Sequence, residues 1–315
     1  MKIGIAAENR SQEKRVLIQP PEINKIASKH EVIVEKGAGV GIDIPDKAFM
    51  DAGCKIGSSK EVYACDLVVR IKEPSFEEIK MMQPGKIIMS MMHLRCRPKL
   101  EEALRKQRLI VIPLENLKDS FGKRKVEAVD ASGRIGMEYG FKLWGKDPAT
   151  CNVKIMGYGN MAIGAVRCAA RKLAKVKILN KKDFLKMDRY ISGTDILVDA
   201  VNRPYRRDVS KEPPFVTRAM LKLLKPGSVI VDLVSNPENH APVETMRPTT
   251  LDDLHYMVDG IYHTSCWGWP GLEPKTIAKR YSLQLTPILK DLADKGIEKC
   301  DDLTKAAIFN YFTLN

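Results

Sequence analysis

The stretch NVKIMGYGNMAIGA, residues 152–165, decides the fold, because it reads as a buried strand, a glycine turn and the start of a helix. Within it GYGNMA, residues 157–162, fits the pattern G-x-G-x-x-A of dinucleotide-binding turns. Gly157 permits the tight turn and Gly159 lets the backbone approach a pyrophosphate. The small Ala162 lets the helix pack close to the strand. The stretch therefore predicts a Rossmann domain.

The surroundings of this turn favour a bound dinucleotide over a tight corner without ligand, although that alternative stays open. The helix that follows, from Asn160 and Met161 onward, presents unpaired N–H groups and its positive dipole end to a phosphate. A second strand ends about twenty residues later, as the motif requires. We expect Val201, at the end of a further strand, to contact the cofactor as well.

The residues after that second strand favour NADP(H) over NAD(H). NAD enzymes usually place an acid there to bind the ribose 2′-hydroxyl, whereas this chain has Asn180, Lys181 and Lys182. A carboxylate would repel a 2′-phosphate, and an amide followed by two lysines would attract it. The alternative is that Asp183 takes the role of the acid and that NAD(H) binds.

Composition and length are those of an ordinary soluble globular protein, for which two domains are expected. The chain has 315 residues, which exceeds the usual size of a single core. No apolar run approaches the roughly 20 residues that span a bilayer, and the first ten residues lack the apolar core of a signal peptide. The seven cysteines are scattered and form no C-x-x-C pair. This pattern predicts free thiols, no zinc site and a cytoplasmic location.

A net charge of +13 indicates attraction to anions such as phosphate-bearing cofactors or carboxylate substrates. The basic residues are spread along the chain, with no long basic block and no interleaved aromatic residues. We therefore expect no nucleic-acid partner and no membrane partner.

Both halves of the chain alternate apolar stretches with helix-like segments, which predicts right-handed βαβ units and parallel sheets. The fold class is α/β, with two Rossmann-like doubly wound parallel-sheet domains and a cleft between them. From Pro274 onward the chain reads as helix and is expected to pack back on the rest. The predicted strands are residues 2–7, 31–35, 66–72, 86–93 and 109–115, followed by 152–157, 176–179, 195–201 and 228–233.

Three basic residues are expected at one edge of the first sheet. Lys72 and His93 end two strands that a single helix joins, and Arg15 lies in the loop after the first strand. Ligands of open α/β sheets bind at this carboxyl edge. Arginine pairs bidentately with a carboxylate, lysine adds a point charge and histidine moves a proton near neutral pH. Taken singly, each residue has a purely structural alternative.

The chain resembles the alanine dehydrogenase/N-terminal transhydrogenase superfamily, which includes saccharopine dehydrogenases and carboxyethylornithine synthase. The resemblance implies that Arg15 and Lys72 bind the substrate carboxylate and that His93 serves acid/base chemistry or substrate binding. It also implies a discontinuous substrate domain, residues 1–132 with 274–315, around a dinucleotide domain of residues 133–273. The stretches that carry it are MKIGIAAENRSQEKRV, EVIVEKGAGVG, DLVVRIKEP, IIMSMMHL, AVDASGRIG, VKIMGYGNMAIGA, MLKLLKPGSVIVDL and WPGLEPKTIAKRYSLQLTPILKDLADKG.

Two places depart from the alanine dehydrogenase pattern. Alanine dehydrogenases carry an aspartate in a D-Q-G-G setting soon after VIVD, and this chain has Asn236 there. An amide cannot exchange a proton as a carboxylate does, so any proton role must fall to the catalytic candidates Lys72 and His93 or to another group. Asn236 is expected to bind substrate. Glu238 and His240 are nearby candidates for a proton role. In CWGWPGLEP, residues 266–274, Trp267 and Trp269 either line a pocket for a larger apolar group or pack at the domain interface.

These observations predict an NAD(P)-dependent oxidoreductase acting on the C–N bond of an amino acid, with NADP preferred. One version joins an amino acid and a 2-oxo acid through a reduced imine, giving a secondary amine. The chain is short and lacks the ribose acid, which favours this version. The other is a simple alanine-type dehydrogenase that uses ammonia. A non-catalytic dinucleotide sensor is the alternative from another class. The resemblance also implies a homo-oligomer, with a dimer favoured.

Overall fold

The computed structural model describes residues 1–203, 212–236 and 240–312. The chain divides into two compact units, and each is described by itself. Unit 1 consists of Met1–Glu127 and Glu273–Asn315, and unit 2 of Ala128–Leu272. Helix α6 (Val129–Trp144) falls wholly within unit 2, whereas the sequence places the domain boundary after residue 132.

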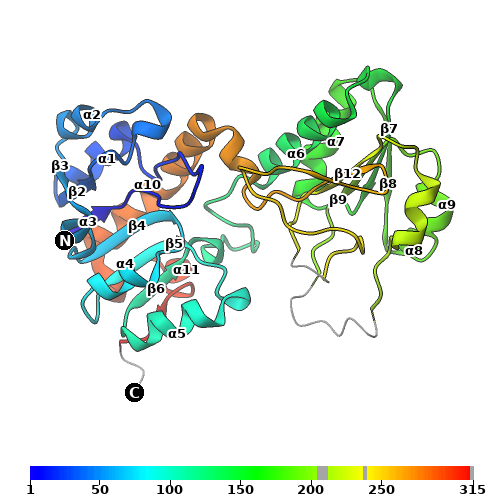
Figure 1. Ribbon diagram of the computed structural model, residues 1–315. Helices are drawn as coiled ribbons and strands as arrows, with labels where there is room; N and C mark the ends of the chain where they lie inside the picture. Colours follow the sequence, from blue (N-terminus) through cyan, green and yellow to red (C-terminus); the bar gives the residue numbers. More distant parts are fainter. Residues whose placement is uncertain (204–211, 237–239, 313–315) are drawn as a thin grey trace. The chain divides into compact units, whose positions relative to one another are not determined.

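Unit 1 is built on a seven-stranded sheet in the order β13-β6-β5-β4-β1-β2-β3 (Figure 1). Its central strands are β-branched and apolar, and they are buried on both faces because helices cover the sheet. The strands are β1 (Lys2–Ile5), β2 (Glu31–Glu35), β3 (Lys55–Gly57), β4 (Leu67–Lys72), β5 (Ile87–Met91), β6 (Ile110–Pro113) and β13 (Phe309–Asn310). The helices are α1 (Pro20–Ala27), α2 (Asp46–Asp51), α3 (Ser59–Tyr63), α4 (Phe76–Met81), α5 (Pro98–Lys106), α10 (Pro274–Lys299) and α11 (Asp302–Lys305).

Unit 2 is built on a six-stranded sheet in the order β11-β12-β10-β9-β7-β8. Helices α6 and α7 pack side by side on it (Figure 1). The strands are β7 (Asn152–Met156), β8 (Lys175–Leu179), β9 (Ile196–Asp199), β10 (Val229–Asp232), β11 (Tyr256–Val258) and β12 (Ile261–Thr264). The remaining helices are α7 (Asn160–Arg171), α8 (Lys181–Phe184) and α9 (Met187–Ile191).

The predicted fold class is confirmed, because most neighbouring strands in both sheets are parallel. The edges differ from the prediction of purely parallel sheets. Strand β11 pairs antiparallel with β12 across the turn Asp259-Gly260, whose residues have φ of 50° and 79°. An Asp-Gly pair with two positive φ angles is typical of a tight β-hairpin. This signal was present in the sequence and outweighs the βαβ pattern at that edge.

The prediction that residues 274–315 are helical is correct for α10 and α11 but wrong for Phe309–Asn310. These residues form β13 and pair antiparallel with Ile110 and Val111 of β6. The physical reason is that β6 would otherwise present an unpaired strand edge. Strand β13 pairs with that edge and covers it.

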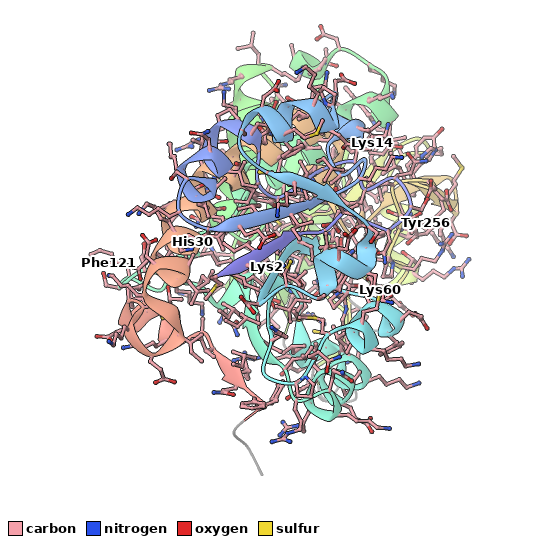
Figure 2. All side chains as sticks on the ribbon, turned by 90° about the vertical axis from the view of Figure 1, so that its left-hand side faces the viewer. Lys2, Lys14, His30, Lys60, Phe121 and Tyr256 are labelled. Carbon is pink, nitrogen blue, oxygen red and sulfur yellow. The ribbon has the colours of Figure 1, made fainter. Side chains whose placement is uncertain are left out.

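The excess positive charge is dispersed. Lys2, Lys14 and Lys60 are exposed and stand apart from one another on one face of unit 1 (Figure 2). No helix among the described residues is long and apolar enough to cross a bilayer. All seven cysteines are free thiols.

Candidate active site

Lys72 is held at the carboxyl end of β4 by a carboxylate from the neighbouring strand. Glu8 follows β1, and its buried side chain accepts hydrogen bonds from the backbone N–H groups of Ile71 (2.6 Å) and Lys72 (3.1 Å). These bonds continue the β1–β4 pairing beyond the point where the strands separate. Burial raises the pKa of Glu8, and Arg70 opposes that rise.

The side chain of Lys72 is a cation in a poorly solvated place. Burial, with the nearby charge of Arg15 acting in the same direction, lowers the pKa of its amine to about 8. Nζ donates no hydrogen bond to any residue that the structure describes. A carboxylate ligand would supply the missing acceptor and the missing negative charge.

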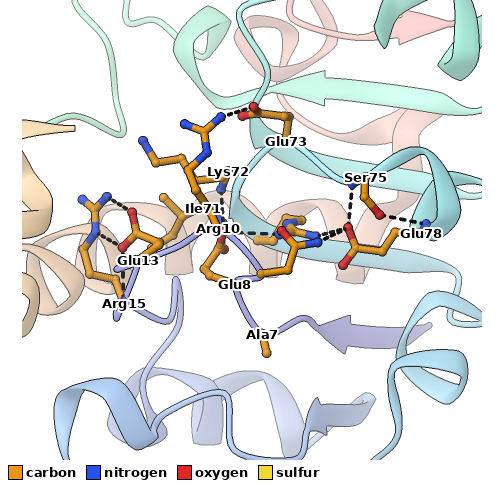
Figure 3. A network of polar contacts seen from close by, with 12 residues as sticks. Ala7, Glu8, Arg10, Glu13, Arg15, Ile71, Lys72, Glu73, Ser75 and Glu78 are labelled. Carbon is orange, nitrogen blue, oxygen red and sulfur yellow. Dashed lines mark hydrogen bonds and ion pairs between the residues drawn. The ribbon is translucent and has the colours of Figure 1, made fainter. Parts of the chain in front are cut away.

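Arg15 is 2% exposed, and one of its terminal nitrogens has no hydrogen-bond acceptor among the described residues. Its Nε donates to Glu13 Oε1 (2.6 Å) and one terminal nitrogen donates to Glu13 Oε2 (2.5 Å), as Figure 3 shows. The guanidinium also lies 5.6 Å from the centre of the Tyr281 ring of α10. The other terminal nitrogen is buried and has no partner in the described chain. A buried donor without an acceptor is costly, so this nitrogen suits a ligand oxygen.

His93 is fixed at the end of β5 by Glu115. The carboxylate of Glu115 accepts from the backbone N–H groups of Met92 (3.1 Å) and His93 (2.5 Å). This holds His93 in a left-handed conformation with φ of 49°. Burial lowers the pKa of the imidazole, with Arg124, Arg97 and Lys72 acting in the same direction against Glu115. The ring is therefore neutral at pH 7 and can accept a proton.

The structure brings Lys72 and His93 to one edge of the unit 1 sheet, because β4 and β5 are paired and Lys72 lies opposite Met91. Arg15 belongs to the loop after β1, the other neighbour of β4. The charge of Arg15 lowers the pKa of Lys72, and the charge of Lys72 lowers the pKa of His93. The predicted set is thus one cluster of groups, with Glu13 as an additional member that pattern reasoning missed.

The glycine turn of unit 2 has the geometry that a dinucleotide needs. Gly157 has φ of 94°, and a Cβ there would lie 3.1 Å from the carbonyl oxygen of Ala200. Gly159 precedes the first turn of α7, and a Cβ there would meet no atom within 4 Å. The space beside the first N–H groups of Asn160 and Met161 is therefore open to a phosphate. Residues present in this turn fit a pyrophosphate.

The residues after β8 form a short capped helix. Asn180 Oδ1 accepts from the backbone of Lys182 (3.0 Å), and Asp183 Oδ2 accepts from the backbone of Asn180 (2.9 Å). The carboxylate of Asp183 is thereby engaged with the backbone, which disfavours its use for a ribose hydroxyl. Lys181 and Lys182 are exposed. Val201 follows β9 and is partly buried.

Asn236 and Trp269 are placed differently from the substrate-binding roles predicted for them. Asn236 is 3% exposed, its Nδ2 donates to Val201 O (3.2 Å), and its Oδ1 accepts a long bond from Arg203 N (3.4 Å). Trp269 is 2% exposed, and its indole N–H donates to Asp232 O (3.2 Å). A Cβ on Gly136 of α6 would lie 2.3 Å from Leu233 Cδ2 and 3.4 Å from the indole, so α6 packs close to both residues.

Trp269 is therefore a core residue of unit 2, which corrects the pocket interpretation. His240 is partly buried and engaged in contacts. Glu238 lies outside the described residues.

Two family models match the chain. The model "Alanine dehydrogenase/PNT, N-terminal domain" matches residues 4–134, and "Alanine dehydrogenase/PNT, C-terminal domain" matches residues 181–310. Alanine dehydrogenase of Staphylococcus haemolyticus is 30% identical over 94% of this chain and 88% of its own length. The chain belongs to the alanine dehydrogenase/transhydrogenase family.

Further relatives agree with this assignment. Alanine dehydrogenase of Bacillus subtilis is 27% identical over 95% of this chain and 87% of its own. A solved L-alanine dehydrogenase superposes with a TM-score of 0.86 at 24% identity, covering 100% of this chain and 96% of the other. A transhydrogenase from Sinorhizobium meliloti gives 0.80 at 21% identity, covering 93% and 95%. These two structures establish the family's fold.

Beyond the predicted residues, this family member carries a buried pair of acids in unit 2. Asp199 and Asp232 end β9 and β10 and lie opposite each other in the register. Asp232 accepts from the backbones of Val234 (2.8 Å), Ser235 (2.9 Å) and Asn236 (3.2 Å). One oxygen of Asp199 has no partner in the described chain. Burial and the charge of Asp232 raise the pKa of Asp199 above its usual value, and burial raises the pKa of Asp232 as well.

Proposed function

We propose that this family member is an NAD(P)-dependent oxidoreductase acting on the C–N bond of an amino acid. The observation that carries the proposal is the pair of unused donors at one sheet edge: the amine of Lys72 and the spare nitrogen of Arg15. Two donor groups without an acceptor, the Lys72 amine and one terminal nitrogen of Arg15, suit the carboxylate common to amino acids and 2-oxo acids. The nearby neutral His93 suits proton transfer.

The roles of the residues follow from this arrangement. Lys72 and Arg15 bind and orient the carboxylate, and Glu13 keeps the Arg15 fork in place. His93 accepts the proton that leaves the substrate nitrogen during oxidation and returns it during reduction. Bound at Gly157 and Gly159, a nicotinamide dinucleotide supplies the hydride acceptor or donor.

The amine partner is the finer part of the proposal. We favour an amino acid, which gives a secondary amine, over ammonia, which gives an alanine-type reaction. Support comes from Asn236, which stands where alanine dehydrogenases have an aspartate and whose amide is engaged within unit 2. The test is consumption of NADPH with pyruvate, glyoxylate or 2-oxoglutarate against a panel of amines. Turnover with ammonia alone would select the simple dehydrogenase. No turnover despite tight NADPH binding would select the dinucleotide sensor.

For the cofactor we propose NADP(H), supported by the exposed Lys181 and Lys182 and by the engaged carboxylate of Asp183. Reversing both charges, Lys181→Glu with Lys182→Glu, should weaken NADPH binding at least tenfold more than NADH binding, because only NADPH carries the 2′-phosphate. Fluorescence titration of both cofactors measures this. An equal effect on both would refute the phosphate role.

A further inference from the structure

Unit 1 contains a pocket of about 620 Å³ beside the Lys72 cluster. It forms where the loop after β1 meets the amino ends of α4 and α5. This volume lies in the range of about 300–1,000 Å³ typical of ligand sites. Its lining includes Arg10, Glu73, Phe76, Cys96, Arg97 and Leu100.

The polar part of the pocket carries a net positive charge. Glu73 forms ion pairs with both Arg10 and Arg97, the latter at 2.5 Å between Glu73 Oε2 and a terminal nitrogen of Arg97. One carboxylate thus sits between two guanidinium groups, and Glu77 and Lys99 in the lining balance each other. A guanidinium has five N–H donors, and the described chain takes only one bond from Arg10. A second carboxylate would find donors here.

The rest of the pocket is apolar. Pro74, Phe76 and Leu100 contribute hydrocarbon surface, and the Phe76 side chain is 48% exposed. An exposed phenyl ring next to paired arginines suits a ligand with an aliphatic stem and a charged end. One cavity therefore combines an apolar wall with a cationic group.

The pocket is continuous along the chain with the groups that hold the α-carboxylate. Glu73 directly follows Lys72, and Figure 3 shows Lys72 beside the Arg10–Glu73 pair, with the Glu13–Arg15 pair on its other side. The charges of Arg10, Glu73 and Arg15 all act on the amine of Lys72, which places the two cationic groups within interaction range. A ligand anchored at Lys72 therefore lies near the Arg10–Glu73 pair (Figure 3).

We propose that this pocket binds the acidic side chain of the substrate, so that the enzyme acts on an amino acid with an aliphatic stem and a terminal carboxylate, or on its 2-oxo acid. This rests on the proposed function for the α-carboxylate and adds a second anchoring point. Arg10 and Arg97 bind the terminal carboxylate, and Phe76 and Leu100 cover the stem.

Calorimetric binding of two probes tests the pocket without any turnover. Glutarate and pentanoate have the same chain length and differ by one carboxylate. Glutarate should bind at least about tenfold more tightly, because charge-assisted hydrogen bonds to arginine are worth more than a methyl contact. Arg10→Met and Arg97→Met should each remove most of this difference. Arg95→Met is the matched control, since Arg95 is exposed and does not line the pocket. Equal binding of the two probes, or equal effects of all three variants, would overturn the proposal.

Kinetics with 2-oxoglutarate and 2-oxopentanoate separate this inference from the proposed function. A preference of at least about tenfold in kcat/KM for 2-oxoglutarate, lost in Arg10→Met and kept in Arg95→Met, is the expected result. Turnover without that preference would refute the acidic side chain and leave the oxidoreductase standing. Selective glutarate binding without turnover of any 2-oxo acid would refute the oxidoreductase and leave the pocket standing.

Discussion

The amine of Lys72 owes its properties to what surrounds it. Removal from water and the adjacent Arg15 both disfavour its positive charge, which is why its pKa falls to about 8. Binding a carboxylate reverses the balance and favours the protonated amine. The charge state of this one residue therefore couples substrate affinity to pH in the physiological range.

We predict that KM for the carboxylate substrate rises as pH increases through about 8, because Lys72 loses its proton and with it one of two cationic contacts. In Lys72→Arg this dependence should disappear, since a guanidinium stays charged. Lys72→Ala should lower kcat/KM at least about 100-fold while leaving dinucleotide affinity nearly intact. Lys86→Ala, which removes an ion pair with Asp66 at the opposite end of β5, is the control. Full activity of Lys72→Ala would contradict the site.

For single residues, the sequence predicted the positions of the basic side chains better than those of the carboxylates that contact them. Lys72 and His93 end strands, and strand ends follow from the apolar pattern alone. The roles of Glu8 and Glu115 were not predicted because they depend on which strands become neighbours. Glu13 binds Arg15 only two residues away, but no sequence pattern shows that the loop between them buries this pair. Whether a tryptophan such as Trp269 faces a pocket or the core also depends on the element opposite it, here a helix with Gly136.

At the scale of elements, the crossing of α6 and α7 is set by two glycines. A Cβ on Gly133 would lie 1.8 Å from the carbonyl oxygen of Met161, and one on Gly164 would lie 1.9 Å from that of Asp130. No side chain can be accommodated at such distances without moving a backbone. The close approach brings α7, whose first turn faces the phosphate site, into a fixed position.

Two alanine substitutions should separate folding from cofactor binding. Gly164→Ala should lower the free energy of unfolding by about 1–3 kcal/mol or more, because the helices must separate. Gly159→Ala should leave stability nearly unchanged, since its Cβ meets open space, yet weaken the dinucleotide by filling the room for its phosphates. Thermal unfolding and cofactor titration of both variants check this. Similar losses of stability in the two would argue against it.

The acids that end β9 and β10 should make unit 2 less stable at neutral pH than at mildly acidic pH. The pKa of Asp199 is raised in the folded state, so the favourable state is the protonated one. Its contribution is fully present below the unfolded pKa of about 3.9 and is lost as pH rises toward the folded value. Asp199→Asn should therefore stabilise the protein by about 1 kcal/mol or more at pH 7 and by less at pH 4. Urea unfolding at both values measures it, with the exposed Asp188→Asn as control. A larger gain at pH 4 would reverse the assignment.

In the whole chain, hydrogen bonds between residues far apart in sequence join α10 to α1 within unit 1. Ser282 of α10 is fully buried, accepts a hydrogen bond from the backbone of Gln19 (2.9 Å) and donates to Glu22 of α1 (2.9 Å). Alternating strands and helices were enough to predict two α/β units. The Phe309–Asn310 strand was missed because pairing with a distant edge leaves no local periodicity.

Ser282→Ala should destabilise unit 1 by about 1–3 kcal/mol, because it leaves the N–H of Gln19 and the carboxylate of Glu22 without their buried partner. Equilibrium unfolding in urea gives the number, and the exposed Ser192→Ala provides a reference of the same chemistry in unit 2. An effect no larger than that of the reference would mean that α10 is joined to α1 by apolar packing alone.

The return of α10 to unit 1 has a consequence for how the protein is made. Ala128–Leu272 are synthesised before Glu273–Asn315, so all of unit 2 exists while unit 1 still lacks its last segment. Until Glu273–Asn315 emerge, β6 has no β13 to pair with, and Arg15 lacks its contact with the ring of Tyr281. Nascent chains stalled shortly after Leu272 would thus be where this protein most needs a chaperone.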